Sequence, residues 1–123
     1  MIERLKKRRD FLAAAKGSRA ARRAFVLEAR KRGDDGPARF GFTVSKRTAA
    51  KAVERNRIRR RLREAVRFGG ESAPVGCDYV LVGRREALNE PFSKLTAALA
   101  DALRQTSESP NSGRDGAPRR IGR

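Results

Sequence analysis

The chain has no histidine, no tryptophan and a single cysteine in 123 residues. Histidine pairs, or carboxylates and histidines gathered around a metal ion, perform much of the acid–base and metal-dependent hydrolysis that proteins carry out. The 14 Asp and Glu residues are scattered, and the adjacent pair Asp34 and Asp35 lies in a turn-like Gly-Asp-Asp-Gly-Pro segment. We therefore expect no catalytic residue, no metal ligand and no cofactor bound by the polypeptide alone.

Long apolar runs are also missing. No stretch could span a membrane, and the apolar residues 11–15 near the N-terminus are too few for the core of a signal peptide. The lone Cys77 excludes an internal disulfide and a CxxC metal site, and it adjoins the apolar run 79–82, so a buried small hydrophobe is expected. These absences predict a cytoplasmic protein without a membrane partner.

Negative charge is scarce relative to positive charge. The chain holds 31 Lys and Arg residues against 14 Asp and Glu, which gives a formal net charge of +17. Hydrophobic residues make up 38% and charged residues 37%, so a chain of this length forms one domain with a lean core. Because so much like charge repels itself, a polyanion such as nucleic acid is the expected partner.

The positive charge is densest in residues 51–67, which are predicted to form a helix. Eight lysines and arginines stand there against only Glu54 and Glu64. At 100° per residue, one stripe holds Ile58, Leu62, Ala65 and Val66, and the opposite side holds Asn56, Arg60, Arg63 and Arg67, with Arg57 and Arg59 flanking. A solvated surface is the alternative interpretation, but such surfaces mix charge signs to form i,i+4 pairs. We expect the first stripe to pack on a core and the second to bind nucleic acid.

The remaining segments predict an α+β two-layer sandwich, in which helices pack on one face of a small mixed sheet. The expected order is a helix, two or three strands, a helix, a strand and a helix. The assignments are a basic arm over residues 1–9, a short helix over 11–16 with Asp10 as its N-cap, strands over 25–29, 40–45 and 78–82 with the last one central, the helix over 51–67, and a last helix after Asn89 that buries Phe92, Leu95, Leu99 and Ala102. Residues 1–105 would form the single domain and 106–123 a disordered basic tail.

Four ordered blocks of the sequence resemble the bacterial ribonuclease P protein component. The segment 54–60, ERNRIRR, is similar to the family's RNR signature, and 42–47, FTVSKR, is similar to the strand end that precedes it. The opening Leu5…Asp10-Phe11 and the strand start 78–80 also match, in the right order and spacing. The resemblance covers about residues 3–104, and four blocks together are far more specific than RNR alone.

This resemblance implies both a fold and a function. The fold would be the two-layer arrangement above, with an unusual left-handed βαβ crossover. The protein would be the subunit of an endoribonuclease whose catalytic RNA removes the 5′ leader of precursor tRNA. Both RNAs would be its partners, and magnesium would sit mainly on the RNA. A nuclease subunit without catalytic residues is then expected.

The resemblance also assigns residues. Contacts to the catalytic RNA would come from the signature helix and the loop before it, namely Lys46, Arg47, Lys51, Arg55, Asn56, Arg57, Arg59, Arg60, Arg63 and Arg67. Phe11 and Phe25 match positions that contact the single-stranded leader, although ordinary core packing is an equal alternative for both. Two aromatic positions of the family hold Ala15 and Glu28 here, so leader binding would depend more on charge.

Two other classes of protein fit the charge and size. One is a basic ribosomal or other structural RNA-binding protein without a nuclease role. The other is a DNA-binding helix module, which is disfavoured because the basic helix lies between strands and lacks a helix-turn-helix partner. DNA is therefore not an expected partner.

Overall fold

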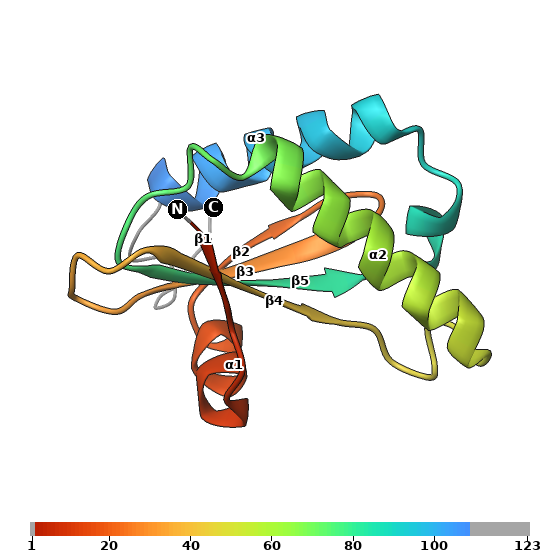
Figure 1. Ribbon diagram of the computed structural model, residues 1–123, viewed down its shortest axis with the longest axis horizontal. Coiled ribbons are helices and arrows are strands. Elements are labelled where there is room, and N and C mark those ends of the chain that lie inside the picture. The colour runs from red at the N-terminus through yellow and green to blue at the C-terminus, as the bar shows by residue number, and fades with distance from the viewer. Residues whose placement is uncertain (1, 109–123) are drawn as a thin grey trace.

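The computed structural model describes residues 2–108, which form a five-stranded mixed sheet flanked by helices (Figure 1). The elements in chain order are β1 (Ile2–Arg4), α1 (Arg8–Ala15), β2 (Ser18–Ala21), β3 (Phe25–Lys31), β4 (Ala38–Thr43), α2 (Ala52–Gly69), β5 (Cys77–Gly83), the 3₁₀ helix η1 (Arg85–Leu88) and α3 (Phe92–Glu108). The strands lie in the order β1-β4-β5-β3-β2. Strand β5 is central, as its continuous apolar run predicted.

Helix α2 connects two parallel neighbours in the sheet, β4 and β5. In Figure 1 both strands run from left to right, β5 lies behind β4, and α2 lies above them. This geometry is a left-handed crossover, contrary to the usual rule for such units. The α+β fold and this crossover are therefore as the resemblance implied.

The main core lies between the sheet and the helices α2 and α3. The predicted apolar stripe of α2 is confirmed, since its buried residues are Ile58, Leu62, Ala65 and Val66. Leu95 and Leu99 of α3 are fully buried as expected. Phe92 was expected beside them but is 38% exposed. It lies in the first turn of α3 and packs edge-to-face on Phe68 near the surface, with ring centroids 5.9 Å apart.

Helix α1 lies on the opposite face of the sheet from α2 and α3, which corrects the prediction that the helices share one face (Figure 1). A second buried cluster forms there from Leu5, Ala14 and Val80, with Phe11 and Val82 packed against it. The physical reason is that β5 is apolar on both of its faces, so both must be covered. Without α1, Val80 would be exposed to water.

Both ends of the domain also differ from prediction. Residues 2–4 were expected in a basic arm, but they form β1, which pairs in parallel with β4. Asp10 was expected as an N-cap, but it lies inside α1, whose N-cap is Lys7. Helix α3 continues through Glu108, beyond the predicted boundary at residue 105. The rest of the predicted disordered tail, 109–123, lies outside the described residues.

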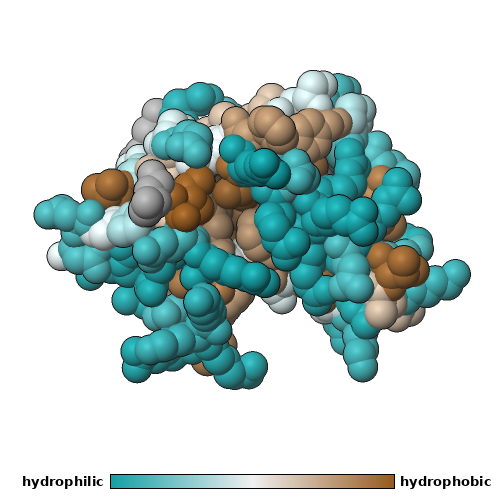
Figure 2. Space-filling view, viewed as in Figure 1, coloured by the Kyte–Doolittle hydropathy of each residue, from teal (hydrophilic) through white to brown (hydrophobic). Residues whose placement is uncertain are grey.

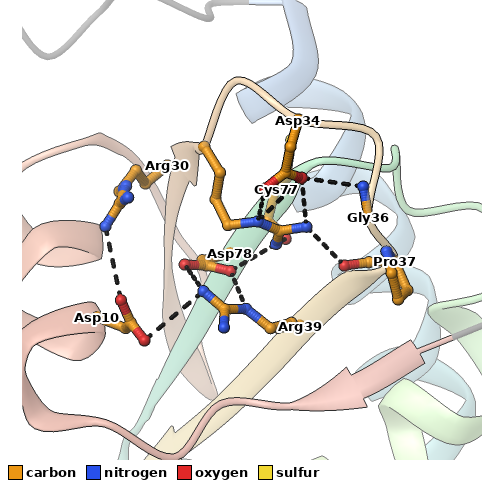
Figure 3. Close-up of polar contacts among 9 residues, drawn as sticks. Asp10, Arg30, Asp34, Gly36, Pro37, Arg39, Cys77 and Asp78 are labelled. Carbon is orange, nitrogen blue, oxygen red and sulfur yellow. Dashed lines mark hydrogen bonds and ion pairs between the residues drawn. The ribbon is translucent and has the colours of Figure 1, made fainter.

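A buried ion-pair network joins α1 to the sheet (Figure 3). Asp78 of β5 is completely buried, and Arg39 of β4 donates to both of its carboxylate oxygens at 2.8 Å. Arg32 donates to the same carboxylate at 2.7 Å. Asp10 of α1 lies 3.6 Å from Arg39 and 3.9 Å from Arg30 of β3. The carboxylate of Asp10 therefore contributes to α1 docking rather than to capping.

The two arginines decide the ionisation of Asp78. Burial raises the pKa of its carboxyl group, but the hydrogen bonds from Arg39 and Arg32 outweigh burial and leave the pKa below its ordinary value. Cys77, the residue before it, is buried as predicted. None of the helices in the described part of the chain is long and apolar enough to cross a membrane.

Candidate RNA-binding surface

The start of α2 is fixed by Arg55, a residue of the RNR-like segment. Its guanidinium donates hydrogen bonds to the carbonyl oxygens of Ala49 and Ala50, at 2.9 and 2.8 Å. Within the same loop, the Ser45 hydroxyl accepts from the backbone N–H of Thr48 at 3.1 Å. These bonds shape the loop between β4 and α2, which displays Lys46 and Arg47. Arg55 was predicted to contact RNA, and the structure places it mainly as a support for this loop.

The other predicted RNA-binding residues gather on one surface, which we call the basic face. It consists of the exposed side chains Lys46, Arg47, Lys51, Asn56, Arg57, Arg60, Arg63 and Arg67. Arg59 is half-buried beside it and donates to the Asn56 side-chain oxygen at 3.0 Å. Hydrophilic side chains cover this flank of the molecule along α2 (Figure 2). The helical period therefore brings together residues from the loop and from four turns of α2.

Most cations of the basic face have no acidic partner. Among residues 2–108, ion pairs are absent for Arg57, Arg60 and Arg63, and for the three loop residues as well. Arg67 forms an ion pair with Glu64 at 3.8 Å, and the charge of Lys51 acts on the Glu54 carboxylate. An array of unpaired guanidinium groups suits a phosphate backbone, since the planar fork donates two hydrogen bonds to one phosphate.

Two other charged residues of α2, Glu54 and Arg61, have partners in the segment between β5 and α3. Glu54 pairs with Arg85 at 3.1 Å, and the hydrogen bond from Arg85 holds the pKa of Glu54 below its usual range. Arg61 donates to the carbonyl oxygens of Ala87 and Glu90, both at 2.6 Å. Arg61 thus fastens α2 to the segment before α3, and it is not among the residues predicted to bind RNA.

The two phenylalanines predicted to bind the leader lie on opposite faces of the sheet. Phe25 is fully buried in the main core beneath α2 and α3. For Phe25 this burial favours the core-packing alternative over contact with the leader. Phe11 is half-buried on the α1 side. Its ring covers Gly41, where an added Cβ would lie 2.5 Å from a Phe11 ring carbon. Gly41, which has no side chain, thus lets the Phe11 ring approach the sheet closely.

Strand alternation places another pair of charged residues on the α1 side. Glu28 of β3 is buried and lies opposite Arg19 of β2. Burial raises the pKa of Glu28, and the positive charge of Arg19 partly offsets this rise. Arg19 was not assigned to leader binding from the sequence. The structure shows its place, because buried Ser18 and Ala20 alternate along β2 with exposed Arg19 and Ala21.

Comparison with known proteins decides the family. The family model described as Ribonuclease P matches residues 2–107, nearly all of the described chain. The chain belongs to the ribonuclease P protein family. The ribonuclease P protein component of Brucella suis is 42% identical, with 92% of this chain and 86% of the relative covered. That of Gluconacetobacter diazotrophicus is 46% identical, with 83% and 89% covered.

Solved structures of ribonuclease P proteins have the same fold. The protein from Thermotoga maritima superposes with a TM-score of 0.70 at 33% identity, covering 84% of this chain and 96% of the other. The protein from Staphylococcus aureus gives a TM-score of 0.66 at 30% identity, covering 84% and 94%. The chain is thus the protein component of a ribonucleoprotein endoribonuclease, and the ribosomal and DNA-binding alternatives lose their support.

Proposed function

We propose that the basic face binds the catalytic RNA of ribonuclease P, and that the α1 side of the sheet binds the 5′ leader of precursor tRNA. The observation that carries the first half is the row of arginines on α2 without acidic partners, Arg57, Arg60 and Arg63. Like charges at this spacing repel each other, so the folded protein is strained electrostatically until a polyanion lies along the helix. RNA rather than DNA is the proposed ligand, in the cytoplasm.

In this proposal the protein contributes charge and position, and the RNA performs the chemistry. The chain has no histidine, and its described part holds no group of three or more His, Cys, Asp or Glu residues that could bind a metal ion. Magnesium, which such an RNA needs for folding and cleavage, does not fit these protein residues and would be bound by RNA. The cations of the basic face replace part of the counterion atmosphere where two RNAs meet.

The proposal for the leader depends on Phe11. Its ring packs on the sheet over Gly41, and part of the side chain is accessible beside α1. Bases of a single strand stack readily on such a ring. Arg19 adds positive charge on the same side of the sheet, while Glu28 occupies a position where the family has an aromatic residue. We therefore propose that one base of the leader stacks on Phe11, and that the positive charge of Arg19 assists its binding.

Reconstitution tests the proposed function. Purified protein alone should not cleave precursor tRNA. Added to a bacterial ribonuclease P RNA, it should restore leader removal at magnesium concentrations too low for the RNA alone, because its arginines reduce repulsion between the phosphates. Cleavage is measured by the release of the 5′ leader on denaturing gels.

The matched control for this assay is the Arg60→Ala variant, which should need more protein or more magnesium for the same rate. Efficient cleavage by RNA-free protein, abolished by replacing a carboxylate, would contradict the proposal. So would a failure of the wild-type protein to lower the magnesium requirement.

The leader contact is tested by Phe11→Leu, which keeps apolar packing over Gly41 but removes the ring. Holoenzyme with this variant should bind leader-bearing precursor tRNA more weakly by about 1 kcal/mol, the low end for one base–aromatic stack. Its affinity for mature tRNA should not change. Equal losses for the two tRNAs, measured by filter binding, would reduce Phe11 to a packing residue.

A further inference from the structure

A groove opens between β1 and the C-terminal half of α2, on the sheet face opposite α1. Its volume is about 400 Å³, and Phe40, Phe42 and Val66 contribute to its apolar floor. Figure 2 shows a hollow on this face, with hydrophobic atoms at its bottom and hydrophilic atoms around it. This groove is separate from Phe11, which lies across the sheet.

The walls of the groove are charged and belong partly to the basic face. Arg63 and Arg67 of α2 line one side, and Arg4 of β1 lines the other. The guanidinium of Arg63 lies over the Phe42 ring, 5.7 Å from its centroid. A cation held over an aromatic ring is already positioned at a π surface that a planar ligand could use.

One carboxylate completes the rim. Glu71 lines the groove and forms no ion pair within residues 2–108, whereas Glu3 lies in register with Arg39 and so points to the α1 side. A carboxylate at the mouth disfavours a second polyanionic backbone lying deep in the groove. It does accept hydrogen bonds from the amino and imino groups on the edge of a nucleobase.

We propose that this groove binds one unpaired nucleotide of the RNA that lies on the basic face. The base stacks on Phe42, its edge faces the carboxylate of Glu71, and its phosphate is held by Arg63 and Arg67. An aromatic floor between arginines is the arrangement by which proteins hold single-stranded RNA, whereas bases in a duplex are not accessible to it. The inference rests on the proposed RNA-binding role of α2 and adds a site selective for unpaired bases.

The test compares two single-stranded probes that carry equal charge. One is a fluorescent decauridylate, and the other is the same chain built from stable abasic ribose units. The quantity measured is the ratio of the affinities for the base-containing and the abasic probe. In the full-length Phe42→Leu variant this ratio should fall about 5-fold, as expected for one lost stack. Phe68→Leu is the matched control, because Phe68 is an exposed aromatic residue of α2 that does not line the groove. Its preference should equal that of the wild type.

A second measurement needs no variant. Wild-type protein irradiated with decauridylate that contains 4-thiouridine should yield crosslinked peptides from residues 2–4, 40–42 or 63–71. An unchanged preference in Phe42→Leu, or crosslinks confined to other peptides, would overturn the groove as a base site.

The proposed function is judged by a different result. Arg60→Ala should weaken binding of both probes equally, since it removes a phosphate contact. If Arg60→Ala binds both probes as tightly as the wild type, the RNA-binding role of the basic face fails. If Arg60→Ala weakens both while Phe42→Leu changes nothing, the basic face stands and the groove is excluded.

Discussion

Replacing Asp78 with alanine is expected to lower the free energy of unfolding by roughly 3–5 kcal/mol, the usual loss when one partner of a buried ion pair is removed. Asp78 is completely buried, and its carboxylate accepts hydrogen bonds from both Arg39 and Arg32. Without it, the guanidinium of Arg32, whose side chain is 9% exposed, would lose its buried acceptor. Urea unfolding followed by circular dichroism measures the difference.

Asp34→Ala is the matched control for this experiment. Asp34 also pairs with Arg32, at 2.9 Å, but its side chain is 56% exposed, so water can replace the contact. The loss of stability should be far smaller than for Asp78→Ala. Equal losses in the two variants would show that the buried network does not hold the sheet and α1 together.

The stabilisation by Asp78 should also depend on pH. Because Arg39 and Arg32 more than offset the effect of burial, the pKa of Asp78 is lower in the folded protein than in the unfolded chain. Its ionised form therefore stabilises the fold above the ordinary aspartate pKa of about 3.9, and this contribution is lost as the pH falls through the folded pKa. The difference in unfolding free energy between the wild type and Asp78→Asn should accordingly shrink below about pH 4. A difference that stays constant from pH 7 to pH 3 would contradict the assignment.

Leu62→Ala and Arg60→Ala should separate stability from binding within one helix. Leu62 is fully buried in the main core, so its truncation should cost roughly 2–5 kcal/mol of unfolding free energy. Arg60 is exposed and has no acidic partner among the described residues. Its replacement should leave the urea midpoint nearly unchanged and weaken RNA binding, with the salt dependence reduced by about one phosphate contact.

These two variants test the orientation of α2 directly. Thermal melts and binding titrations at several salt concentrations should place each variant in one class. Arg60→Ala unfolding as readily as Leu62→Ala would mean that the two sides of the helix are assigned incorrectly. Unaltered RNA affinity in a folded Arg60→Ala variant would remove the basic face from the proposed function.

The sequence alone predicted the helix, over residues 51–67, and its two sides; the structure has it at Ala52–Gly69. Helical periodicity is a local property, so the positions of Ile58 and Leu62 relative to Arg60 and Arg63 follow from spacing alone. The central position of β5 could also be predicted from local sequence, because a run of apolar residues from 79 to 82 must be buried on both faces. The RNR-like segment and its ordered companions then indicated the family, because their order and spacing do not require knowledge of the fold.

Only the tertiary structure decided which helix covers which face of the sheet. Alternation along β3 shows that Phe25 and Val26 point to opposite sides, but it does not show that α1 lies on the side of Val26. For this reason Phe11 and Phe25 were both matched to positions that contact the leader, although the sheet separates them. The free energy that fixes this arrangement comes from burying Val80 beneath α1, a contact between segments far apart in the chain.

The partners of the charged residues were likewise settled by the fold. From the sequence, Arg55 and Arg60 were both predicted to bind RNA, and Arg61 was assigned no role. In the structure Arg55 binds carbonyl groups of the preceding loop and Arg61 binds the segment before α3, whereas Arg60 has no ion-pair partner within residues 2–108. A guanidinium becomes structural when the fold brings unsatisfied buried carbonyl oxygens within its reach, because leaving such groups without a hydrogen bond is costly. Local sequence specifies the charge of each side chain, and the chain's long-range packing specifies which of those charges remain free to bind RNA.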